Sequence, residues 1–172
     1  MSKILKSFGL AALLVALLAG TGMADSDTTA IDGTVTQSME LTVPTAITGW
    51  TLNLGTNTDA TKSVTVGSNA ASGTTTLKVA DKRDLSGATG GAQNANGFMT
   101  NTGKTDALDN ALKLTVADGA GQVTLDGTDT LAFTLTNPGT ATKTVTFSQL
   151  VEADDPLGAH DIVVTFTTAH VA

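Results

Sequence analysis

Apolar side chains recur at every second position along most of the chain after residue 34, and threonine occupies many of the positions between them. Val35, Met39, Leu41 and Val43 share one face of the first such segment, with Gln37 as a polar residue on the same face. A period of two is that of a β-strand, whose successive side chains point to opposite faces. Threonine suits such a strand because its branched Cβ restricts χ1 while its hydroxyl group tolerates water. The pattern predicts an all-β fold.

Nine short segments carry the alternation, and turn residues separate them. We expect strands at 34–43, 50–54, 64–66, 77–79, 112–116, 123–125, 131–135, 145–151 and 162–166. Turn sequences rich in Gly, Asn, Asp and Pro stand at 55–59, 118–119, 126–127, 137–139 and 155–158. This arrangement predicts a single β-sandwich of Greek-key, immunoglobulin-like or jelly-roll type.

Charged residues suggest which strands are central. Segments 130–136 and 162–168 carry no charged side chain, as expected of buried central strands. Lys78 and Lys113 lie in the middle of strands, where a lysine discourages edge-to-edge pairing. We expect the two strands with lysines to be edge strands or to turn these lysines toward solvent.

Residues 81–110 do not fit the alternation, since they are rich in Gly, Asn and Ala and poor in β-branched apolar residues. They predict a long loop, which is usually functional or disordered in a compact domain. We expect Phe98 and Met99 to attach its middle to the core. A short helix at 105–112 is an open alternative for its end.

The first 24 residues have the layout of a secretory signal peptide. Lys3 and Lys6 precede the apolar run 8–19, and the small residues Gly22 and Ala24 stand before Asp25. Twelve helical residues rise about 18 Å, which is short of a hydrocarbon core of about 30 Å. We therefore expect cleavage after residue 24, leaving one secreted domain at 25–172, extracellular or at the cell surface, with no membrane span.

Loss of the two N-terminal lysines leaves seven basic and sixteen acidic side chains, a net charge of −9. Such a protein has no electrostatic basis for binding nucleic acid or anionic lipid. The chain has no cysteine, and a domain of this length can bury enough surface to be stable without disulfides.

No set of residues predicts an active site. After residue 24 there is no Cys or Tyr, one arginine (Arg83) and two histidines, His160 and His170, on either side of the last expected strand. An extended strand would hold the two imidazoles about 30 Å apart, too far for one catalytic or zinc site. We expect neither enzymatic activity nor a cofactor.

Two kinds of residue are candidates for binding. Asp126, Asp129, Asp154 and Asp155 lie in turns, where hard carboxylate oxygens suit calcium; ordinary solvated turn aspartates are the alternative. Trp50 is in phase with Leu52 and Leu54, so it belongs either to the core or to a sugar-stacking surface.

Three stretches carry a resemblance to known proteins: Leu-Thr-Val-Pro-Thr-Ala-Ile at 41–47, Gly-Trp-Thr-Leu-Asn-Leu-Gly at 49–55 and Asp-Pro-Leu-Gly-Ala-His-Asp-Ile-Val-Val-Thr-Phe at 155–166. In these the chain resembles exported β-sandwich proteins of archaea and bacteria, including those with the WxL surface domain. The resemblance implies a subunit of the cell surface or of an extracellular filament. Some such filaments, similar to those of TasA, join subunits by donating an N-terminal strand.

Segment 34–43 is therefore either a strand donated to a neighbouring copy, through Val35, Met39, Leu41 and Val43, or the first strand of its own sandwich. We expect a secreted structural or cell-surface protein that assembles with itself or with other surface components. The alternative is a monomeric extracellular module that binds carbohydrate or calcium through residues 81–110.

Overall fold

The structure is a computed structural model that describes residues 34–89 and 95–172. The expected signal peptide, 1–24, lies outside the described residues. Residues Thr36–Ala172 form one compact unit. The described residues contain eleven strands and no helix: β1 Met39–Thr42, β2 Gly55–Ser68, β3 Thr74–Asp81, β4 Phe98–Asn101, β5 Ala107–Ala111, β6 Lys113–Val116, β7 Gln122–Thr124, β8 Thr130–Thr136, β9 Gly139–Val151, β10 His160–Asp161 and β11 Val164–Val171.

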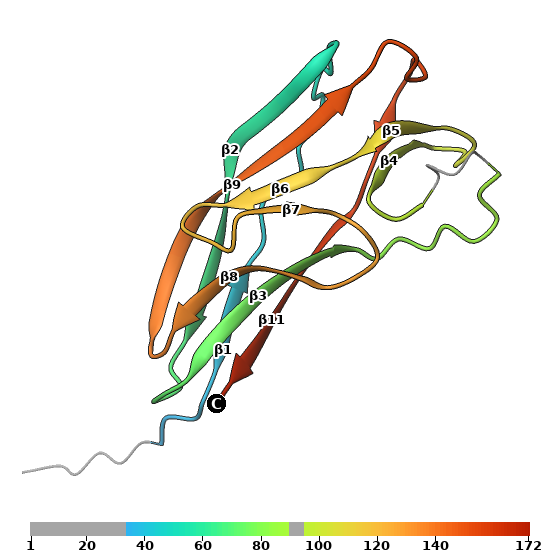
Figure 1. Ribbon diagram of the computed structural model, residues 1–172. Helices are drawn as coiled ribbons and strands as arrows, with labels where there is room; N and C mark the ends of the chain where they lie inside the picture. Colours follow the sequence, from blue (N-terminus) through green and yellow to red (C-terminus); the bar gives the residue numbers. More distant parts are fainter. Residues whose placement is uncertain (1–33, 90–94) are drawn as a thin grey trace, which may run out of the picture. The chain divides into compact units, whose positions relative to one another are not determined.

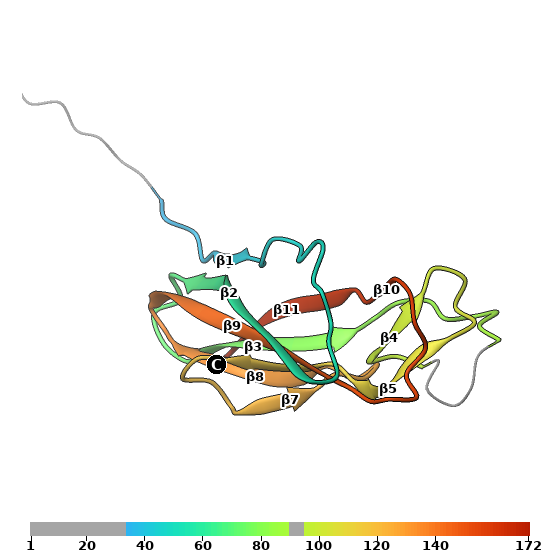
Figure 2. The same ribbon diagram turned by 90° about the horizontal axis from the view of Figure 1, so that it is seen from above.

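The strands form three antiparallel sheets (Figure 1). The largest has the order β1-β2-β9-β6-β7, and the second has the order β11-β3-β8. The third, β10-β4-β5, is small and lies at one end of the other two. In Figure 2 the order β11, β3, β8 can be followed across the second sheet.

The core consists of side chains from the two larger sheets. Those of β2, β9, β6 and β7 meet those of β3 and β8, and the buried cluster is Val64, Val66, Leu77, Val79, Leu112, Leu114, Val116, Val123, Leu125, Ala132, Phe133, Leu135, Val145 and Phe147. Alternate residues of the strands enter this cluster, as two stacked sheets require, except in β8, where an irregularity buries the adjacent residues Ala132 and Phe133. The all-β sandwich expected from the alternation is confirmed.

Eight of the nine expected strand segments overlap a strand. The exception is 50–54, which belongs to an irregular connection at 43–54 between β1 and β2. Within it Ile47 and Trp50 pack against the core cluster, although neither is in a strand.

The expected turn at 55–59 is wrong, because β2 already begins at Gly55 and pairs with β9 from there. A β-bulge follows directly after this segment: Ala60 and Thr61 of β2, between Asp59 and Lys62, stand opposite one residue of β9. A carboxylate oxygen of Asp59 accepts hydrogen bonds from the backbone N–H and the hydroxyl group of Thr61 at 2.8 and 2.6 Å. Backbone pairing with the long strand β9 thus outweighs the turn preference of residues 55–59.

The long loop expected at 81–110 is also only partly correct. It contains the β4–β5 hairpin, and β5 stands where a short helix was the alternative. Met99 is buried as expected, while Phe98 is partly buried.

The expected strand order is wrong for the uncharged segments, since β8 and β11 are the two edges of the second sheet. Lys78 lies on the central strand β3 and Lys113 on β6, between β9 and β7, and both side chains are exposed. The expectation that these lysines face solvent is confirmed. A lysine on the outer face of a sandwich is solvated on a central strand as well as at an edge, so it does not mark an edge.

Candidate functional site

Of segment 34–43, only the four residues Met39–Thr42 form a strand, which pairs with the outer side of β2. Leu41 packs against the core, whereas Met39 is 48%, Val43 51% and Val35 88% exposed. Pro44 follows directly and, lacking an N–H group, cannot extend the pairing. Most of the apolar face of this segment is therefore in contact with solvent.

Asn69, just after β2, ties the start of this segment to the domain. Its Oδ1 accepts a hydrogen bond from the backbone N–H of Ser38 at 2.6 Å, and its Nδ2 donates to the carbonyl of Thr36 at 2.9 Å. One side chain and four paired residues thus hold β1 in place.

A cavity of about 750 Å³ opens between the connection 43–54 and the residues that lead into β11. Its apolar lining includes Trp50, Leu52, Met99, Leu112, Phe147, Ile162 and Phe166. This volume is in the range of ligand pockets. Trp50 lines the cavity and also packs on the core cluster, so its expected contact with the core is present.

His160 also lines this cavity. Its Nδ1 lies 3.2 Å from the carbonyl oxygen of Gly158, which accepts a hydrogen bond in the tautomer that carries the proton on Nδ1. Its Nε2 is buried and has no hydrogen-bond partner among the described residues. His170, in β11, instead contacts Asn137 through Nδ1 at 3.0 Å, so the two histidines do not share a site.

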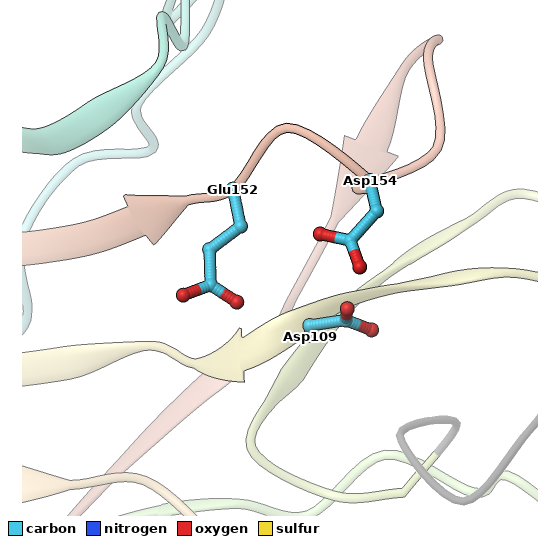
Figure 3. Close-up of side chains that lie close together, drawn as sticks. All are labelled: Asp109, Glu152 and Asp154. Carbon is cyan, nitrogen blue, oxygen red and sulfur yellow. The ribbon is translucent and has the colours of Figure 1, made fainter.

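Three carboxylates converge beside the third sheet (Figure 3). Asp109 comes from β5, and Glu152 and Asp154 come from the turn after β9; one oxygen of each lies within 4.8 Å of the others. Calcium binds oxygen ligands at about 2.3–2.6 Å, so such a group spans a cation and leaves several positions for water. We call these three residues the acidic triad.

Asp155 positions the triad without joining it. Its carboxylate is buried and accepts hydrogen bonds from the backbone N–H groups of Asp109 at 2.6 Å and Glu152 at 2.7 Å. The turn after β9 is thereby fixed against β5.

Of the four candidate calcium ligands, only Asp154 is in the triad. Asp126 accepts a hydrogen bond from the N–H of Thr128, and Asp129 forms a salt bridge with Lys82 at 3.1 Å. Sequence reasoning missed Asp109 and Glu152, because they meet where the turn after β9 contacts β5, a long-range contact that no local spacing reveals.

Hydrogen bonds within the fold hold the side chain of Arg83, the one arginine of the chain after residue 24. Its Nε and Nη2 donate to both carboxylate oxygens of Asp81 at 2.8–3.1 Å, and the Asp81 side chain is fully buried. The remaining guanidinium hydrogens reach the carbonyls of Phe98 and Asp161 and the hydroxyl group of Thr100. Arg83 thus joins β3 to β4 and β10.

The pKa of Asp81 is held below its ordinary value. Burial alone would raise this pKa, but hydrogen bonds from Arg83 and from the backbone N–H of Gly97, together with the positive charge of Arg83, lower it further than burial raises it. Asp81 is therefore a buried, paired anion rather than a proton donor.

No protein-family model matches this chain, and no curated protein is significantly similar to it. Among the described residues, no helix is long and apolar enough to cross a membrane.

Proposed function

We propose that this chain is a secreted structural protein of the cell surface that assembles with further copies of itself through segment 34–43. The observation that carries the proposal is the solvent exposure of Met39, Val43 and Val35, which share the apolar face of that segment. Burying a Val or Met side chain contributes about 1.5–3 kcal/mol. An apolar face that the subunit's own core leaves open is therefore available for contact with another copy.

Two further features support this role. Arg83, the one arginine of the described residues, donates its guanidinium hydrogens to groups of the protein itself rather than to a ligand. The strongly negative charge expected for the exported form suits a protein that must stay soluble until it assembles at a specific contact.

The test is the assembly state of the purified exported protein, followed by sedimentation velocity and negative-stain microscopy over a range of concentrations. We expect polymers for the natural sequence and their loss in the double variant Val35→Asp, Met39→Asp. Both side chains are exposed in the single chain, so these changes should leave the subunit folded.

The matched control adds the same charge to the opposite face of the same segment, as Thr36→Asp, Thr42→Asp. These variants should still polymerise. A natural protein that stays monomeric at every concentration would refute the proposal, and equal loss in both double variants would refute the role of the apolar face.

A second candidate function is a monomeric extracellular module that binds calcium or carbohydrate. The acidic triad favours calcium, and the position of Trp50 in the wall of a large cavity favours a sugar. A ligand that binds only the folded state raises the melting temperature. Calcium should then stabilise the natural protein and the control Asp129→Asn but not the variant Glu152→Gln, Asp154→Asn.

A further inference from the structure

β11 is an unusual edge strand. It has eight residues, pairs with β3 in unbroken register on one side, and receives no backbone hydrogen bond on its other side from the described residues. It contains no proline and no charged side chain apart from the titratable His170. Long, regular and uncharged edges are the ones on which a further strand can add.

The other sheet edges are short, interrupted or covered. β1 has four residues, β7 three and β10 two, while β5 carries Asp109 and has an irregular register. β8 is bulged at Ala132, whose carbonyl accepts a hydrogen bond from the N–H of Ala120 at 2.9 Å. Among the outermost described strands of the three sheets, β11 is therefore the one without such protection. The part of β2 that β1 leaves unpaired, residues 55–64, carries Asp59 and Lys62 and is interrupted by the bulge between them.

The sequence of β11 fits a strand with neighbours on both sides. The absence of charge from 162–168 predicts a central strand, yet in the single chain this strand lies at an edge. One added strand would make it central.

The cavity described above lies against the first half of this edge. Val164 and Phe166 of β11 line it together with Trp50, Ile162 and Val163. Alternate side chains of a strand added to an edge point to the same face, so apolar residues with a period of two can enter such a cavity.

We propose that the outer edge of β11 and this cavity form the docking site for segment 34–43 of a second copy. This inference rests on the proposed function and names the acceptor for it. Segment 34–43 has ten residues for an edge of eight, presents Val35, Met39 and Val43 on one face and carries a single charge, at Glu40. Release of this segment requires loss of its four-residue pairing with β2, of the contacts of Asn69 and of the packing of Leu41 against the core.

Such a contact is head-to-tail, because the segment of one copy meets a different surface of the next. A heterologous contact of this kind continues into a filament when its rotation does not close a ring.

A pair of matched variants tests the acceptor. Ala169 of β11 and Thr134 of β8 are both exposed and both pair with Thr76, from opposite sides of the same sheet. Ala169→Lys places a lysine at the proposed docking edge, and Thr134→Lys places one at the covered edge. We expect the Ala169→Lys protein to form no polymers and the Thr134→Lys protein to form them. When either lysine is added to the monomeric Val35→Asp, Met39→Asp protein, the melting temperature should change little.

A second test mixes two monomeric variants and measures the stoichiometry of the complex that they form. The Val35→Asp, Met39→Asp protein keeps an intact acceptor, and the Ala169→Lys protein keeps an intact donor segment. Together they should form a complex of one copy of each and nothing larger, whereas each alone stays monomeric.

The outcomes separate the two proposals. A monomeric natural protein refutes the proposed function itself. Polymers that persist in Ala169→Lys refute β11 as the acceptor while leaving self-assembly intact. Assembly that Ala169→Lys abolishes but Val35→Asp, Met39→Asp does not would show β11 paired with a segment other than 34–43, and would overturn the assigned occupant.

Discussion

Arg83 donates hydrogen bonds to both carboxylate oxygens of Asp81, two residues earlier, and the same guanidinium reaches the carbonyls of Phe98 and Asp161. One side chain thus holds β3 and the small third sheet together. This relationship makes Arg83 a structural centre of the region that the sequence predicts to be a loop.

Replacing this arginine should be costly. Arg83→Ala leaves the Asp81 carboxylate buried without its partner, and removal of one member of a buried ion pair costs about 3–5 kcal/mol. We expect a fall of that size in the free energy of unfolding, measured with urea. The control is Lys82→Ala, which breaks the exposed salt bridge with Asp129 and should cost no more than about 1 kcal/mol. Equal falls in the free energy of unfolding for the two variants would contradict this structural role of Arg83.

Asp81 should also contribute to stability in a pH-dependent way. Because its folded-state pKa is depressed, its contribution is present above the unfolded value of about 3.9 and is lost as the pH falls through the lower folded-state pKa. The variant Asp81→Asn should therefore be less stable than the natural protein at pH 7, and the gap should narrow below about pH 4. Urea unfolding from pH 7 to pH 2.5 measures this gap. A constant gap across that range would show that the charge of Asp81 is not what stabilises the fold.

The core predicts a contrast between two leucines. Leu114 of β6 is fully buried between the sheets, while Leu131 of β8 is 40% exposed. Leu114→Ala should lower the free energy of unfolding by about 2–5 kcal/mol, since it removes buried apolar contacts and leaves a cavity. Leu131→Ala should cost clearly less, and a reversal of this order in denaturant titrations would argue against the sandwich core.

Trp50 is the one tryptophan of the chain and lines the cavity beside β11, so its fluorescence reports on that cavity. Docking of an apolar segment should remove water from the indole ring and shift its emission to shorter wavelength. We expect this shift when the natural protein assembles, relative to the monomeric Val35→Asp, Met39→Asp protein. Assembly with unchanged emission would place the contact away from this cavity.

Periodicity predicts which side of a strand is buried far better than it predicts which strands are neighbours. Leu77 and Val79, Leu112 and Leu114, and Phe147 all lie in the core as their alternation indicates, and Gln149 is buried among them. Gln37 was expected on the same kind of face but is exposed, because the sandwich does not extend over the start of segment 34–43. Local sequence contains no information about how far the opposite sheet reaches.

The remaining differences have the same origin in long-range pairing. Residues 55–59 have turn chemistry but pair with β9, and the β4–β5 hairpin forms from residues with weak strand preference because Arg83 and Asp81 supply fixed partners for it. The acidic triad depends on strands that lie far apart in the sequence. Of that site, the sequence predicted Asp154 and the supporting residue Asp155, through their position in a turn.

The bulge between Asp59 and Lys62 and the Ala120–Ala132 hydrogen bond that covers β8 restrict where neighbours can attach. A molecule with several open sheet edges would associate with its copies laterally as well as end to end and would form branched aggregates. In the proposed assembly, β11 is the one docking edge and segment 34–43 its one occupant, so growth would be confined to one dimension. The proposed assembly would then be a thread of uniform width, because two small irregularities in the backbone leave no other edge for attachment.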